Sequence, residues 1–109
     1  MLAVNVTQAK ALRLISPNGG ETFKAKQKRI VTWQSNGLPM NAKLKLSVSK
    51  NGVKWIPLAT VRNTGFANWK PTKSQVGDSV QLRLCAPATS RLPNDLRCDE
   101  TDDTLTVER

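Results

Sequence analysis

The stretch 43–61 constrains the fold more than any other, because its residue pattern predicts two strands joined by a tight turn. Every second residue of its first half is apolar, namely Leu44, Leu46 and Val48. That spacing is typical of a strand with one buried and one solvated face. Asn51 and Gly52 predict a two-residue hairpin turn, since both accept a positive φ. Pro57 removes one hydrogen-bond donor from the second strand, which predicts an edge or bulged position for it.

Further strand-like segments follow one another along the chain at short, even spacing. They are residues 11–15, 28–34, 66–69, 80–85 and 104–107, and turns rich in glycine, proline, asparagine or charged residues separate them. With the hairpin they make about seven strands, and no segment has the period of a helix. A chain of 109 residues suits one domain. The sequence therefore predicts a single all-β antiparallel sandwich over 11–109, preceded by a loose lead-in at 1–10.

Positive charge is concentrated in the first part of the chain. The net charge is +9, and residues 1–75 hold 13 Lys or Arg against one acid, whereas residues 76–109 hold 4 against 7. Such a basic body could attract nucleic acid, acidic glycans or anionic membranes. The lysines are scattered at strand spacing, however, which favours an ordinary solvated surface that protects sheet edges. Two groups could form a patch if the fold aligned them: Lys43, Lys45, Lys50 and Lys54, and Lys24, Lys26, Lys28 and Arg29.

Cys85 and Cys98 are the only cysteines. Their spacing differs from that of a paired-thiol redox motif, and two cysteines without histidine cannot complete a zinc site. The even count and close spacing favour a disulfide over two free thiols. A disulfide would stabilise the fold by about 3 kcal/mol and would place the protein in an oxidising compartment.

The sequence offers no candidate for catalysis. It contains no histidine, which excludes a Ser-His-Asp or Cys-His arrangement and a histidine-bound metal. The segment 18–21 (NGGE) lacks the Lys-Ser/Thr that a phosphate-binding loop requires, and it precedes a strand. Glu21 has no carboxylate near it in the sequence with which to form a glycosidase pair. We therefore expect a protein that is not an enzyme and has no cofactor.

The three tryptophans admit two interpretations. Exposed, they would stack on sugar rings; buried, they would fill the space between two sheets. Trp33 shares a strand face with Val31, which favours the core. Trp55 and Trp69 lie beside turns, so they are the candidates for ligand binding, together with Lys43, Lys45 and Lys54.

An acidic stretch near the end of the chain is a weaker candidate for calcium binding. Asp99, Asp102 and Asp103 could supply oxygen ligands, but their spacing does not match the long calcium loop of a helix-loop-helix site. A solvated turn that balances Arg91 and Arg97 is the favoured interpretation.

Several stretches together resemble one family of immunoglobulin-like domains. They are 15–21 (ISPNGGE), 31–33 (VTW), 55–59 (WIPLA), 63–65 (NTG) with Trp69 and Pro71, and 102–107 (DDTLTV). In this order they are similar to the Ser/Thr-rich GPI-anchored, yeast cell-wall-synthesis N-terminal type of domain, which recurs in bacterial secreted and surface proteins. The resemblance covers residues 14–107 and implies an immunoglobulin-like antiparallel β-sandwich of about seven strands without catalytic activity. The 85–98 loop and the excess of lysine depart from the family pattern.

The resemblance and the disulfide predict a non-catalytic module of an exported protein, located outside the cell, at its surface or in the periplasm. Such a module would serve adhesion, polysaccharide contact or domain spacing within a larger multi-domain protein. Two alternatives stay open: a basic surface domain that binds acidic polymers, and a structural protein–protein module of a surface appendage or phage particle. Nucleic acid is not the expected partner, because no aromatic ladder or RNA-binding motif accompanies the lysines. No apolar run approaches the roughly 18 residues of a membrane span.

Overall fold

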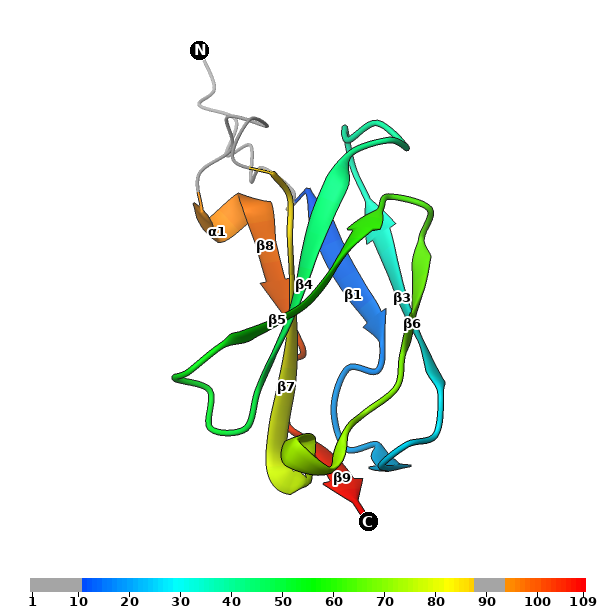
Figure 1. Cartoon of the computed structure of the whole chain (residues 1–109). Helices are drawn as coiled ribbons and strands as arrows, with labels where there is room; N and C mark the ends of the chain where they lie inside the picture. The colour runs from blue at the N-terminus through cyan, green and yellow to red at the C-terminus, as the bar shows by residue number, and fades with distance from the viewer. Residues whose placement is uncertain (1–10, 88–93) are drawn as a thin grey trace.

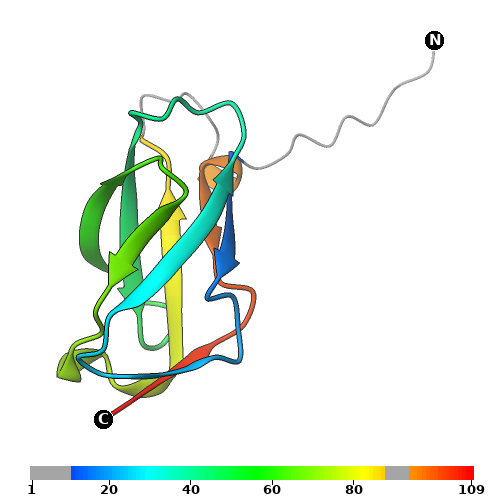
Figure 2. The ribbon, with the colours of Figure 1, turned by 90° about the vertical axis from the view of Figure 1, so that its right-hand side faces the viewer.

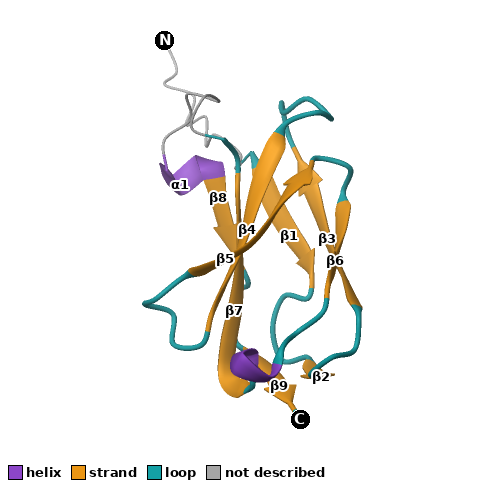
Figure 3. Ribbon diagram, in the orientation of Figure 1, coloured by secondary structure: helices purple, strands orange, loops and turns teal. Residues whose placement is uncertain are grey.

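The computed structural model describes residues 11–87 and 94–109, so the lead-in expected at 1–10 lies outside the described residues. The chain forms two β-sheets that enclose one apolar core (Figure 1, Figure 3). The smaller sheet has the order β1-β3-β6, formed by β1 (Leu12–Ser16), β3 (Arg29–Ser35) and β6 (Phe66–Trp69). The larger sheet has the order β2-β9-β7-β4-β5, formed by β2 (Thr22–Lys24), β9 (Leu105–Glu108), β7 (Gly77–Cys85), β4 (Lys43–Ser49) and β5 (Ile56–Arg62). A further strand, β8 (Cys98–Glu100), pairs with the last residues of β7.

The predicted all-β antiparallel sandwich is confirmed, with one parallel pair, β2 and β9. Nine strands occur among the described residues, in place of the expected seven or so. The additional strands β2 and β8 have three residues each. β8 takes up part of the stretch 99–103 that was expected to be a turn. Two short helical turns also lie in loops, η1 (Lys73–Gln75) and α1 (Asn94–Arg97).

The core follows from the alternation of apolar residues along the strands. Leu44, Leu46 and Val48 are buried at 0–2% exposure, as the period of two predicts. Trp33 is 4% exposed and belongs to the same core, which confirms its expected position. The other buried members come from both sheets: Leu12, Leu14, Val31, Trp69, Val80, Leu82, Leu84, Ala86, Leu105 and Val107.

The hairpin of β4 and β5 differs from its prediction in the turn. Residues 50–55 connect the strands, so the connection is longer than the two-residue turn that Asn51 and Gly52 indicated. The Ser49 hydroxyl accepts the Gly52 amide at 2.8 Å, and Asn51 Oδ1 accepts the amide of Lys54 at 2.9 Å. Side-chain acceptors thus close the longer loop locally. The expected position of Pro57 is confirmed, because β5 is an edge strand and its register with β4 shifts next to Pro57.

The turn at 18–21 packs against the turn at 102–104. The Glu21 carboxylate accepts the amides of Asn18 (3.0 Å) and Gly19 (2.7 Å), so it closes its own turn. The Asn18 amide group and Asp102 exchange two hydrogen bonds, of 2.8 and 2.9 Å. A Cβ on Gly19 would lie 2.6 Å from the Cβ of Asp103, so a side chain would prevent this close approach. The acidic and glycine residues of this motif therefore have structural roles.

One end of the sandwich collects three segments that are distant in the sequence. β2, η1 and the C-terminal strand β9 all lie at this end, as the turned view shows (Figure 2). We call it the C-terminal end. No helix in residues 11–87 or 94–109 is long and apolar enough to cross a membrane.

Candidate functional site

Two of the three tryptophans are buried and cannot stack on a ligand in the folded protein. Trp69 is 3% exposed, its ring packs edge-on against Phe23 with centroids 5.9 Å apart, and its Nε1 donates to Gln75 at 3.2 Å. Trp33 donates its Nε1 to Asn63 at 3.0 Å within the core. The interpretation of Trp69 as a sugar platform is therefore wrong. Its place beside a turn left burial and exposure both open, and alternation along β6 directs it inward.

Trp55 is half-buried on the outer face of the larger sheet. The guanidinium of Arg83 lies 4.0 Å from the centre of its ring, a cation–π contact. Arg83 Nε and Nη2 both donate to one oxygen of Glu100, at 3.1 and 2.6 Å. Below this stack, Ser47 of β4 pairs with Arg83 and is only 7% exposed, so the expected solvated face of β4 is partly covered. Because Arg83 stacks on one ring face, Trp55 does not form an extended aromatic platform.

The lysines predicted to contact a ligand do not converge. Lys43 and Lys45 are exposed on β4, whereas Lys54 lies in the loop beyond the other end of that strand. With a rise of about 3.3 Å per residue, the length of β4 separates Lys43 from this loop by about 20 Å. These residues cannot hold one small ligand together.

The acidic residues considered for calcium point to separate partners. Asp99 Oδ2 accepts the Leu14 amide at 2.7 Å, Asp102 bonds to Asn18, and Asp103 Oδ1 accepts the Thr104 amide at 2.7 Å. Across the described ranges, no group of three histidine, cysteine or acidic residues is placed to hold a metal. Of the two arginines expected to balance this stretch, Arg91 lies outside the described residues.

The predicted disulfide is confirmed. The sulfur atoms of Cys85 and Cys98 are bonded, at 2.05 Å, and the two residues are direct partners in the pairing of β7 with β8. The bond therefore fastens β8 to the larger sheet.

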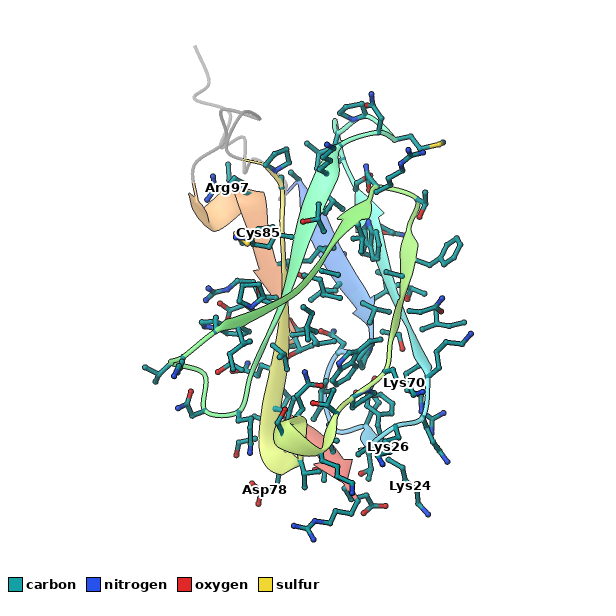
Figure 4. All side chains as sticks on the ribbon, viewed as in Figure 1. Lys24, Lys26, Lys70, Asp78, Cys85 and Arg97 are labelled. Carbon is teal, nitrogen blue, oxygen red and sulfur yellow. A yellow bond between two sulfur atoms is a disulfide. The ribbon has the colours of Figure 1, made fainter. Side chains whose placement is uncertain are left out.

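Cationic side chains gather at the C-terminal end (Figure 4). Lys24 and Lys26 come from β2 and the turn that follows it, and Lys70 lies near them. Two backbone hydrogen bonds join these segments. The Ala25 amide donates to the backbone carbonyl of Glu108 at 2.7 Å, and the Lys26 amide donates to the backbone carbonyl of Pro71 at 2.6 Å. β-strand pairing and these bonds fix the positions from which the side chains extend.

A pocket of about 480 Å³ opens among these segments. Its lining residues are Ala25, Lys26, Lys73 and Arg109, so three of the four carry a positive charge. The Arg83–Glu100 ion pair lies near the other end of β7, away from this pocket. Two acids lie at the same end: Glu108, opposite Lys24 in the β2–β9 register, and Asp78 at the start of β7 (Figure 4). The three positively charged side chains that line the pocket can attract an anion. We define the cationic end by the residues Lys24, Lys26, Lys70, Lys73 and Arg109.

Sequence reasoning found two of the five residues of the cationic end. It grouped Lys24 and Lys26 with Lys28 and Arg29 because they are close along the chain. The Arg29 guanidinium lies 5.4 Å from the ring centre of Phe23 and so packs on that ring. Lys70, Lys73 and Arg109 were missed, because only the folding of β6, η1 and β9 brings them to β2.

Comparison of the chain with family models, curated proteins and solved structures finds no match.

Proposed function

We propose that this protein is a non-catalytic, immunoglobulin-like β-sandwich module of an exported or cell-surface protein, and that its cationic end binds acidic polysaccharides. The observation that supports this most is a pocket lined by Lys26, Lys73 and Arg109, with Lys24 and Lys70 at the same end of the molecule. Cations from several segments on one surface attract a polymer that carries regularly spaced anions. The burial of Trp33 and Trp69 argues against the rival mechanism, stacking on a neutral sugar chain.

The disulfide supports export. Disulfides persist in oxidising surroundings such as the periplasm or the cell exterior, and small domains in those places depend on them. The Cys85–Cys98 bond in a chain of 109 residues fits this pattern. The negative charge of acidic polysaccharides complements the net charge of +9.

We expect co-sedimentation with an insoluble carboxylated polysaccharide at low salt and none with cellulose. Between about 50 mM and about 200 mM salt the affinity should fall by about 20-fold, because three cationic side chains in contact with the polymer release about two of its counterions. The Trp55→Ala variant should bind as the wild type does, since the proposed contact is electrostatic. Sedimented fractions at a series of polymer concentrations give the dissociation constants.

Three outcomes would contradict this proposal. Retention on cellulose at high salt, lost in Trp55→Ala, would make the protein a neutral carbohydrate-binding module. Equal affinity for double-stranded DNA and the acidic polysaccharide would indicate a general basic surface. No binding to any polymer would leave domain spacing or protein contact as the function.

A second candidate, a protein–protein module, is favoured by an uncovered apolar surface. Ile30 of β3 and Phe66 of β6 are 58% and 56% exposed on the outer face of the smaller sheet. They are diagonal neighbours, because Phe66 pairs with Thr32, two residues beyond Ile30. Ile15 of β1, 45% exposed, lies on the other side of Thr32. Half-exposed large apolar residues that adjoin one another are typical of a contact surface.

If this surface joins two copies of the chain, sedimentation equilibrium should show a dimer that dissociates on dilution. The variant Ile30→Ser/Phe66→Ser should be monomeric at every concentration, with the same circular dichroism spectrum. A wild-type protein that stays monomeric at millimolar concentration would exclude self-association through this surface.

A further inference from the structure

The pocket at the cationic end has the construction of a discrete anion site. Its three charged residues come from three segments: Lys26 from the turn after β2, Lys73 from η1, and Arg109 from the end of β9. The Ala25 amide donates to the backbone carbonyl of Glu108 at 2.7 Å, and the Lys26 amide to that of Pro71 at 2.6 Å. The turn after β2 is thus joined to β9 and to the residues just before η1. These backbone bonds fix where the side chains begin, and the three positively charged side chains line one pocket. An anion would offset the repulsion among them.

Lys26 is unusual in its backbone conformation. Its φ is 70°, and no other non-glycine residue in 11–87 or 94–109 has a positive φ. Glycine adopts this conformation without steric cost, whereas a residue with a Cβ does not. The sequence thus places a lysine where glycine would suit the backbone better. Residues in strained conformations of this kind cluster at functional sites, which makes Lys26 a candidate for one.

The chemistry of the lining residues selects the type of anion. A guanidinium such as that of Arg109 presents parallel N–H donors that match two oxygens of one phosphate or sulfate group. Lysine ammonium groups act as point charges toward the remaining oxygens. The volume of about 480 Å³ is far larger than one such group, so a sugar unit that carries it can enter as well.

We propose that this pocket binds a phosphate or sulfate ester group, through Lys26, Lys73 and Arg109. The inference rests on the proposed function, since it selects esterified polymers from among the acidic polysaccharides. The proposed pocket requires one localised binding site, whereas the proposed function requires only general attraction of a polymer to the cationic end.

The test is a titration of the isotope-labelled protein with inorganic phosphate, and separately with sulfate, at low ionic strength. Nuclear magnetic resonance records the chemical shifts of the backbone amides at each concentration. We expect saturable shifts at Ala25, Lys26, Lys73 and Arg109, with a dissociation constant in the millimolar range. The variant Lys26→Gly/Lys73→Gln should raise that constant at least tenfold. Its melting temperature should be no lower than that of the wild type, because glycine relieves the strained φ.

The matched control is Lys43→Gln/Lys45→Gln, which removes the same charge elsewhere. Lys45 pairs with Cys85, the last residue of β7, whereas β9 beside the pocket pairs with Gly77, the first residue of β7. The two sites are therefore about 25 Å apart along that strand. The control should leave phosphate binding unchanged. An equal loss in both variants would overturn the inference, because it would reveal diffuse attraction.

The failure of this inference can be told apart from the failure of the proposed function. Absence of saturable shifts with both anions, while the wild type still sediments with an acidic polysaccharide, would reject the pocket and keep the function. Saturable shifts at the pocket without binding to any polymer would keep the pocket and reject the function. Stronger binding of phosphate than of sulfate, or the reverse, identifies which ester the pocket accepts.

Discussion

Removal of the disulfide, in the variant Cys85→Ser/Cys98→Ser, should lower the free energy of unfolding by about 3 kcal/mol. The cysteines are 13 residues apart, and closing a loop of this length restricts the unfolded chain, which stabilises the folded state relative to it. For a chain of this size, the same loss corresponds to a fall in melting temperature of about 12 °C. Urea unfolding followed by tryptophan fluorescence measures the difference.

The position of β8 gives a second reason for a large effect. β8 pairs with β7 in the larger sheet, and its Asp99 accepts the Leu14 amide of β1 in the smaller sheet at 2.7 Å. Loosening β8 therefore weakens a connection between the two layers as well. As a control, a reducing agent should destabilise the wild type by the same amount and leave the double-serine variant unchanged. A loss below about 1 kcal/mol would show that strand pairing alone restrains this loop.

Strands long enough to show a period were predictable from the sequence. In β4 the alternation of Leu44, Leu46 and Val48 with polar residues directed the prediction, and these residues are buried. β2 and β8 have three residues each, which is too few for a period to appear. They are strands because β9 and β7 offer them hydrogen-bonding partners, and tertiary context of that kind is absent from a local pattern.

The candidate site was predictable only where its residues are neighbours in the sequence. Lys24 and Lys26 were noticed as a group, but Lys73 and Arg109 reach them through the packing of η1 and β9. Trp69 shows another limit of local patterns, because its nearness to a turn left both burial and exposure open. The strand β6, which has four residues, directs the Trp69 side chain inward, where it contacts Phe23 and Gln75.

Asn63 is the residue whose loss should have the other large effect on stability. It is 7% exposed, and its Oδ1 accepts the buried Nε1 of Trp33 at 3.0 Å. Its Nδ2 donates to Ser35 Oγ at 2.8 Å and, at 3.3 Å, to the carbonyls of Leu38 and Pro39. One side chain thus joins β3, the loop after β3 and the end of β5. Asn63→Ala should cost about 3 kcal/mol, because it leaves the indole N–H buried without an acceptor and releases the loop.

A double-mutant cycle separates the indole contribution from the rest. Trp33→Phe removes the donor. The loss of unfolding free energy in the double variant should therefore be smaller, by about 1 kcal/mol, than the sum of the losses in the two single variants. The matched control is Asn68→Ala, because Asn68 is an exposed asparagine on β6. This substitution should change the free energy of unfolding by no more than about 0.5 kcal/mol. Strict additivity in the cycle would mean that Asn63 acts through Ser35 and the loop carbonyls alone. In that case the side chain would hold the loop after β3 in place, and Trp33 would depend only on its packing in the core.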